Sequence, residues 1–392
     1  MCASLRVPIR ESHSSLPLAR EWPSTCHKER EKAMTPTTAP SAPPLFDAAT
    51  LSHLAGRPGP CLTVLLPACS PGSGSGERHT VLESLFHTLP APDAVQLLGR
   101  IEDALAAHGL NGGGPGLAIV AGSGYLEIYR APVPASQIEQ DSYPFVLPLL
   151  PDALAPHDFF VLELSEKQLR LMHYLHGELT PLELPGTMAA SLEQFRHRED
   201  HGDQNRENRT STGSVPGMIG ARRFGTLSER EDASLHRERF FARADDSLAA
   251  LLGPRLLLLM GVDEEVAAFR RVAKHCQMFA EQIPHPAVRH LPLREIAQRA
   301  SECALSHGRA RGTGALNEIR EKADRRLTLA GNEAILEAAR AGRVHLVCIP
   351  EAAGASRDEQ LLWNAAAIET LRHRGEVLVA GDTRELAALL RY

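Results

Sequence analysis

The sequence lacks an apolar run long enough to cross a membrane. Its apolar runs, such as Leu256–Met260, span only a few residues, whereas a membrane-spanning helix needs about 18 or more. It also lacks the basic start and the apolar stretch of about 7–15 residues that are typical of a secretory signal. We therefore expect a cytoplasmic protein without a membrane partner.

Metal-binding patterns are weak. The seven cysteines include no CxxC pair, so neither a disulfide framework nor a zinc ribbon is expected. Two histidine pairs have spacings that could hold zinc: His173 with His176, and His197 with His201. However, His173 falls on a predicted strand, where residues three apart face opposite sides. Asp200 also replaces the glutamate of an inverted zincin motif. We expect no metal site.

Motifs for nucleotide binding and nucleophilic catalysis are absent too. The glycine-rich loop 72–76 lies between a predicted strand and a predicted helix, but it lacks the Gly-Lys-Ser/Thr ending of a P-loop. No Gly-x-Ser-x-Gly elbow follows a strand, and no cysteine has a histidine close by in a suitable turn. The sequence therefore predicts no catalytic residue and no cofactor.

Neither sign of charge is in large excess. There are 42 basic and 48 acidic side chains, which give a net charge of −6. This balance excludes a protein that coats nucleic acid over its whole surface, so any contact with nucleic acid must use a local patch. Hydrophobic residues make up 43% of the chain, which is enough to build buried cores.

The chain has 392 residues, which suggests two or three domains. Composition and periodicity divide it into four parts: a disordered tail at 1–44, an N-terminal α/β domain at 45–152, a middle domain at 156–293 and a C-terminal domain at 294–392. Strands that alternate with helices predict the α/β class, with largely parallel pairing in the last domain.

Hydrophobic periodicity also predicts individual elements. The expected strands are 62–66, 117–121, 125–130, 159–164, 168–174, 179–184, 256–260, 288–293, 344–349 and 377–380. The expected helices are 78–110 with a break near Pro90, one that Ser228 caps, 264–278, 294–306, 332–340 capped by Asn332, 359–372 and 384–390.

One polar stretch, at 196–226, is unusually long for a loop inside a compact domain. Such loops are usually functional or disordered. From Asn205 to Thr226 it carries four arginines, Arg206, Arg209, Arg222 and Arg223, against one acidic residue, Glu207. A basic, glycine-containing loop on an acidic protein is suited to contacting RNA phosphates. The alternative is a variable insertion with solvated arginines.

The order of these segments resembles the class-I release factors of archaea and eukaryotes, their Pelota/Dom34 relatives, and the bacterial archaeo-eukaryotic release factor family. The N-terminal resemblance lies in Leu45-Phe-Asp47, Leu62–Pro67, Gly116–Ile119 and Pro144–Leu150. Further along, Leu256–Gly261 is similar to a release-factor strand and its turn. Asn332–Ile349 and the ending Ala387–Tyr392 are similar to the family's last domain. The resemblance covers about residues 45–392.

The resemblance implies a fold for each of two domains. It implies a ribonuclease-H-like middle domain and a C-terminal α-β-α sandwich like that of kink-turn-binding ribosomal proteins. It also implies that the long loop enters a site lined by RNA.

The loop departs from the family at its tip. Release factors carry Gly-Gly-Gln there, followed by Arg-Phe. Taking Arg223-Phe224 as that Arg-Phe places Gly217, Met218 and Ile219 at the tripeptide. Ile219 offers no hydrogen bond to a water molecule, so we expect no peptidyl-tRNA hydrolysis. Gly202-Asp203-Gln204 lies too early in the loop to replace it.

The expected function is a non-catalytic, ribosome- or tRNA-associated factor in bacterial translation rescue, stress response or hibernation. The resemblance implies the ribosome, rRNA or tRNA and a translational GTPase as partners, and a monomer. The alternative is a metal-dependent hydrolase that uses the histidine-rich loop. A scaffold for protein interactions without an RNA role is a third possibility.

Overall fold

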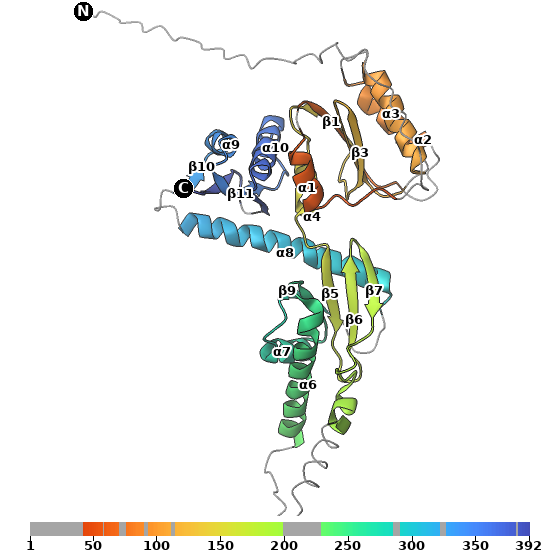
Figure 1. Ribbon diagram of the computed structural model, residues 1–392, viewed down its shortest axis with the longest axis vertical. Coiled ribbons are helices and arrows are strands. Elements are labelled where there is room, and N and C mark those ends of the chain that lie inside the picture. Colours follow the sequence, from red (N-terminus) through yellow and green to blue (C-terminus); the bar gives the residue numbers. More distant parts are fainter. Residues whose placement is uncertain are drawn as a thin grey trace, which may run out of the picture. The chain divides into compact units, whose positions relative to one another are not determined.

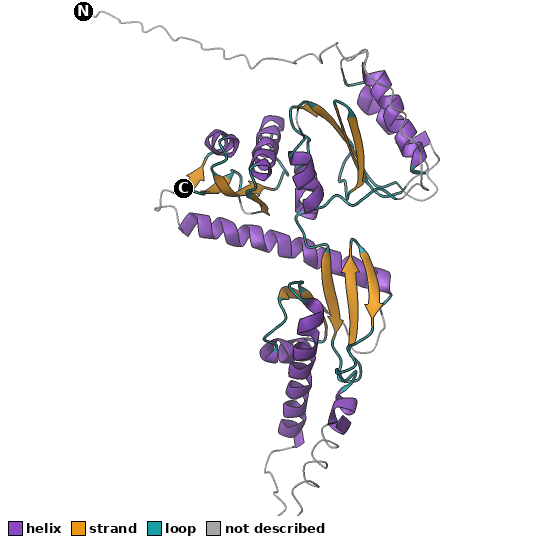
Figure 2. Ribbon diagram, in the orientation of Figure 1, coloured by secondary structure: helices purple, strands orange, loops and turns teal. Residues whose placement is uncertain are grey.

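The protein is described from a computed structural model. The described residues are 42–57, 59–69, 76–89, 93–110, 114–198, 229–284, 291–321, 327–381 and 383–392. They form a mixed α/β structure with three sheets, one in each of the three segments expected to fold (Figures 1 and 2). Within these ranges, no helix is both long enough and apolar enough to span a bilayer.

The N-terminal sheet has four strands, all antiparallel, in the order β3-β2-β1-β4. Its elements are α1 Ala48–Ala55, β1 Cys61–Leu66, α2 Gly76–Phe86, α3 Asp93–Ala107, β2 Leu117–Gly122, β3 Tyr125–Arg130 and β4 Gln137–Asp141. Alternate residues of β1 face opposite ways: Cys61 and Leu65 pack with α1, whereas Leu62 and Val64 pack with α2 and α3. Helices therefore cover both faces.

The N-terminal segment begins before the expected residue 45. The Arg130 N–H donates to the carbonyl of Pro44 at 2.8 Å, and Arg130 Nε donates to that of Pro43 at 2.8 Å. Residues 42–44, which composition assigns to the tail, thus attach to β3. Residues 1–41 lie outside the described part.

The middle sheet has five strands in the order β7-β6-β5-β8-β9. Its elements are β5 Asp158–Glu163, β6 Arg170–Leu175, β7 Glu178–Leu182, a helix at 192–198, α6 Glu229–Leu252, β8 Leu257–Gly261, α7 Asp263–Val272 and β9 Met278–Pro284. The strands β5, β6 and β7 are antiparallel neighbours, and β8 and β9 extend the sheet in parallel. Helices α6 and α7 cover one face.

The other face of the middle sheet packs on the first half of α8, which spans Leu293–Glu321. This helix is much longer than the expected 294–306, because its second half packs on the next sheet. Leu316 and Ile319 of α8 contact Cys348 and Ala380 there. One continuous helix therefore serves two sheets (Figure 1).

The C-terminal sheet has the order β10-β13-β11-β12. Its elements are β10 Thr328–Ala330, α9 Asn332–Arg340, β11 Val344–Pro350, α10 Arg357–Arg372, β12 Glu376–Ala380 and β13 Ala387–Leu390. Helices α9 and α10 pack on one face and α8 on the other, which makes a three-layer α-β-α arrangement. Only the β11–β12 pair is parallel, so the expectation of largely parallel pairing was wrong.

Several expected elements differ from the structure. The helix expected at 384–390 is the strand β13, because Ala387–Leu390 pairs with both β10 and β11. The helix expected at 264–278 ends at Val272, and β9 follows it. Of the strand expected at 288–293, residues 288–290 lie outside the described part, and Leu293 already begins α8. Asn332 is the first residue of α9 rather than its cap, and its Oδ1 accepts from Trp363 Nε1 and the Leu386 N–H.

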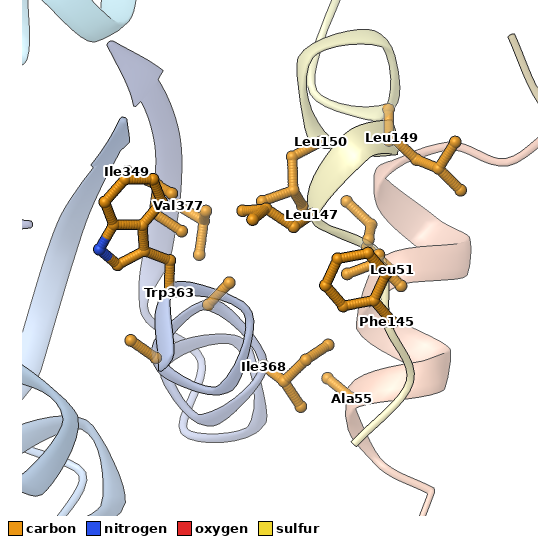
Figure 3. Close-up of a cluster of buried hydrophobic side chains, with 14 of the residues drawn as sticks. Leu51, Ala55, Phe145, Leu147, Leu149, Leu150, Ile349, Trp363, Ile368 and Val377 are labelled. Carbon is orange, nitrogen blue, oxygen red and sulfur yellow. The ribbon is translucent and has the colours of Figure 1, made fainter. Parts of the chain in front are cut away.

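The N-terminal and C-terminal segments share one apolar cluster. Figure 3 shows Ile368 of α10 facing Ala55 of α1. Leu147 and Leu150, from the turns η1 Leu147–Leu149 and α4 Leu150–Ala153, lie between α10 and α1. Asn364 is fully buried at this junction: its Oδ1 accepts from the N–H groups of Val146 and Leu147, and its Nδ2 donates to the carbonyl of Pro144 at 2.9 Å.

Candidate nucleic-acid interface

The site residues expected from the sequence all lie in one stretch. Residues 199–228 are outside the described part of the chain. They include the arginines Arg206, Arg209, Arg222 and Arg223, and the tripeptide Gly217, Met218 and Ile219. Their roles stay predictions. The structure describes the two elements that flank this stretch, the helix 192–198 before it and α6 after it.

The helix before the stretch is short but well anchored. The Ser191 hydroxyl accepts from the Gln194 N–H at 3.1 Å, and Gln194 Oε1 accepts from the Ala190 N–H at 2.7 Å. These bonds satisfy backbone donors at the start of the helix. Leu192 and Phe195 face inward and are buried. The polar residues Arg196, His197 and Arg198 are therefore left on the exposed side.

Both flanks pack into the same apolar cluster. The ring of Phe195 lies 5.7 Å from that of Phe240 in α6, measured between centroids, and Phe241 meets Phe269 of α7 edge-on at 5.7 Å. Aromatic pairs at such distances add to the stabilisation from burial. The helix 192–198 and α6 thus pack on the same face of the middle sheet.

Exposed basic side chains occur on both flanks. Arg196 and Arg198 are exposed on the first helix, and Arg239 and Arg243 are exposed on α6. Arg239 and Arg243 lie four residues apart, so they share one side of α6. Arg196 and Arg198 directly precede the stretch 199–228, whereas Arg239 and Arg243 lie in the middle of α6.

Two acidic side chains of the described part of α6 and α7 are paired with arginines. Glu264 accepts from Arg237 Nη1 at 2.9 Å, and Glu238 accepts from Arg271 Nη1 at 2.6 Å. These pairs hold α6 against α7 and neutralise the carboxylates. Glu193 and Asp246 are exposed acidic residues in the same area. Exposed side chains of both signs therefore occur on this face.

Histidine positions give no support to the metal-dependent alternative. His173 Nε2 lies 2.7 Å from Asp158 Oδ1, and its ring stacks on Phe160 with centroids 4.8 Å apart. His176 sits in the turn after β6 with a φ of 51°. His197 is exposed on its helix, and His201 is outside the described ranges.

One other group brings three potential ligands together among the described residues: Asp245, Asp246 and His275. Both carboxylate oxygens of Asp245 already accept hydrogen bonds. Its Oδ2 accepts from the N–H groups of Lys274 and His275 at 2.7 and 3.0 Å, and its Oδ1 accepts from that of Cys276 at 3.0 Å. Burial alone would raise the pKa of Asp245, but these hydrogen bonds together lower it. Asp245 is therefore a structural cap for the turn after α7.

Asp245 carries no recognisable signal in the sequence. It looks like one more acidic residue on a polar helix, and its partners lie about 30 residues further on. Gly261, which ends β8, could be recognised from the sequence. The structure gives the reason for glycine there: a Cβ would approach the Leu164 carbonyl to 3.0 Å. Leu256–Gly261 was in fact part of the family resemblance.

Residues 158–343 match the model of bacterial archaeo-eukaryotic release factor family 3. The chain is release-factor-like. The matched part of this release-factor-like chain contains the middle sheet, both flanks of the basic stretch, the whole of α8 and α9. No curated protein matches the sequence.

Solved structures are similar at low identity. The archaeal translation termination factor aRF1 is 15% identical with a TM-score of 0.22, over 88% of this chain and 96% of that one. Pelota of Archaeoglobus fulgidus is 11% identical with a TM-score of 0.34, over 90% and 93%. Dom34 of S. cerevisiae is 10% identical with a TM-score of 0.30, over 90% and 94%.

Proposed function

We propose that this chain is a ribosome- or tRNA-associated factor of bacterial translation that does not release peptides. It works in the cytoplasm, as a monomer, in rescue of stalled ribosomes, stress response or hibernation. The observation that carries the proposal is the match to a bacterial release factor family over residues that enclose the basic stretch 205–226. In this proposal the middle domain has a ribonuclease-H-like fold, and the C-terminal sandwich has the fold of kink-turn-binding ribosomal proteins.

The basic stretch supplies the contact with RNA in this proposal. Four arginines, Arg206, Arg209, Arg222 and Arg223, stand close together on a chain of net charge −6. Arginine binds phosphates through a planar fork and also stacks on unpaired bases. The exposed arginines of helix 192–198 and of α6 add to the same local field.

The absence of hydrolysis rests on Ile219. Positioning a water molecule against an ester requires a polar group within hydrogen-bond reach, and Ile219 stands where Gly-Gly-Gln would end. When the protein is added to ribosomes that carry peptidyl-tRNA, we expect the ester to stay intact. Release that survives Gln204→Ala but is lost in Ile219→Ala would contradict this assignment.

Co-sedimentation with ribosomes tests the association. We expect the protein to pellet with ribosomes at low salt and to dissociate steeply as salt rises, because phosphate contacts release counterions. Replacing Arg206, Arg209, Arg222 and Arg223 by alanine should lower the salt slope by up to about 3, at about 0.7 per single-strand phosphate contact. The matched control replaces four exposed arginines elsewhere, Arg100, Arg294, Arg309 and Arg384, by alanine.

The two quadruple variants separate the outcomes. Both carry the same net charge, so a general charge effect would weaken them equally. Loss of binding in the first variant alone supports the proposal. Equal binding of the wild type and of both variants would mean that the stretch 199–228 is a passive insertion. Stoichiometric zinc in the purified protein would favour the metal-dependent hydrolase instead.

A further inference from the structure

A second basic surface lies on the C-terminal domain. Helices α9 and α10 both end at the edge of the sheet where β11 and β12 begin and where β13 ends. Five exposed arginines gather at this edge, which we call the arginine edge: Arg340, Arg343, Arg372, Arg374 and Arg391.

Backbone contacts hold the arginine edge together. The Arg391 N–H donates to the Arg343 carbonyl at 2.9 Å, and Arg391 Nε donates to the Val344 carbonyl at 3.1 Å. Arg391 Nη2 also donates to the carbonyl of His373. The ends of β13, α9 and α10 are therefore joined, and their arginines form one surface rather than scattered charges.

The acidic groups around this edge leave a basic surplus. Glu369 is buried, where it accepts from Tyr143 at 2.7 Å and from Arg372 Nη1 at 3.0 Å. Glu376 accepts from Arg311 of α8 at 2.9 Å. Glu337, the third carboxylate of this region, is exposed on α9. Five guanidinium groups thus stand near three carboxylates, two of which have partners. One of the five, that of Arg372, also donates to the carbonyls of Ala55 and Arg57.

Part of this arginine content has a structural reason. Arg340 and Arg372 lie in the last turns of their helices, where a positive charge offsets the negative end of the helix dipole. Arg391 is tied to backbone carbonyls. Arg343 and Arg374 follow the helix ends, are exposed, and have no ion pair within the described ranges.

Arg374 also has an unusual backbone. Its φ is 58°, in the left-handed region that glycine adopts freely and that costs other residues roughly 1 kcal/mol. The equivalent turn after α9 does use glycine: Gly342 has a φ of 67°. The fold alone would favour glycine at residue 374, so the arginine side chain there points to a role outside the fold.

We propose that the arginine edge is a second surface that binds the sugar-phosphate backbone of single-stranded RNA. The proposal rests on the proposed function. Arginines bind phosphates, and Tyr392, which follows Arg391 and is 75% exposed, offers a ring on which a base can stack. An acidic protein segment would use the charge but would gain less from the aromatic ring.

The test uses the full chain and a fluorescent 20-nucleotide RNA of mixed sequence, with binding measured by anisotropy at several salt concentrations. The double variant Arg343→Gln/Arg374→Gly removes two charges without straining the fold, because glycine suits the backbone of residue 374. We expect about tenfold weaker binding, a salt slope lower by about 1.4, and an unchanged or higher melting temperature. The control Arg100→Gln/Arg384→Gln makes the same charge change elsewhere.

The outcomes are distinct from those of the proposed function. Equal binding by the double variant and its control would overturn the arginine edge, whatever the variant of Arg206, Arg209, Arg222 and Arg223 does. Weaker binding of that quadruple variant alone would leave the proposed function standing without the edge. A wild-type chain that binds polyglutamate but not the RNA would overturn the RNA assignment and identify an acidic protein as the partner.

Discussion

The two faces of the C-terminal sheet join other parts of the chain in different ways. On the face covered by α10, the N-terminal segment is attached through an apolar cluster into which polar groups are built, chiefly Asn364 and the Tyr143–Glu369 bond. On the other face, α8 approaches the sheet through small residues. A Cβ on Gly312 would lie 1.9 Å from the Val379 carbonyl oxygen.

The difference has a physical meaning. Buried hydrogen bonds are directional, so the junction at α10 fixes how the N-terminal segment is oriented. Close backbone packing is limited by sterics, so the junction at α8 fixes how near the helix can come. The stability of the junction at α10 should therefore be sensitive to the loss of polar groups. That of the junction at α8 should be sensitive to added side-chain volume.

The largest effect is expected at the polar junction. Asn364→Ala removes the partner of two buried N–H groups and one carbonyl, all from residues 144–147. Leaving buried groups unpaired costs about 1–3 kcal/mol each, and relaxation reduces the sum, so we expect a loss of about 4 kcal/mol. Denaturant unfolding measures it. Gln360→Ala, on the same helix and with only local partners, should cost less than about 1 kcal/mol.

A small loss of stability in Asn364→Ala would contradict the view that buried hydrogen bonds orient the N-terminal segment. It would mean that water replaces the amide at little cost and that the apolar cluster alone joins the two segments. Hydrogen exchange separates the cases, because a disrupted junction should expose the N–H groups of residues 146 and 147 first.

At the close-packed junction, a glycine-to-alanine substitution in α8 should lower or raise the stability, depending on its position. Gly312→Ala places a methyl group against the backbone of β12, and overpacking of this kind costs about 1–3 kcal/mol. Gly314→Ala, in the same helix, has no atom within 4 Å of the added Cβ and should stabilise by about 0.5–1 kcal/mol. Thermal and denaturant unfolding of both variants test this. Equal effects of the two substitutions would show that α8 does not lie as close to β12 as the structure places it.

Sequence reasoning predicted the local part of this architecture. The hairpin around Gly122-Ser123-Gly124 and the apolar strands β8 and β11 carry their signals in adjacent residues. The prediction was wrong where pairing with a strand that is distant in the sequence determines the secondary structure. Ala387–Leu390 has good helix formers, yet pairing with β10 and β11 makes it a strand.

The two proposed RNA-binding surfaces differ in the same way. The basic stretch was visible as a local run of charge in the sequence. The arginine edge was not, because Arg343, Arg374 and Arg391 come together only when two helices and a terminal strand end at one edge. Asn364 was invisible for the same reason, since its partners lie more than 200 residues earlier in the chain.

The smallest effect should come from a polar contact that joins no two segments. Asp245 ties α6 to the turn after α7, both inside the middle domain. Its pKa in the folded protein is lowered, so the stabilisation it gives is present above its unfolded pKa of about 4 and is lost as pH falls further. Asp245→Asn should therefore cost about 1–2 kcal/mol at pH 7 and less at pH 3.

Asp246→Asn is the control for this last change, because Asp246 is exposed and its ion pair, at 3.4 Å, is with His275, which is also exposed; its cost should stay below about 0.5 kcal/mol. Denaturant unfolding at several pH values gives the differences. A cost for Asp245→Asn that is the same at pH 7 and pH 3 would contradict a lowered pKa. Loss of hydrogen-exchange protection at residues 144–147 in this variant would show that the middle domain and the α10 junction are coupled, so that contacts within one segment also decide how the segments are joined.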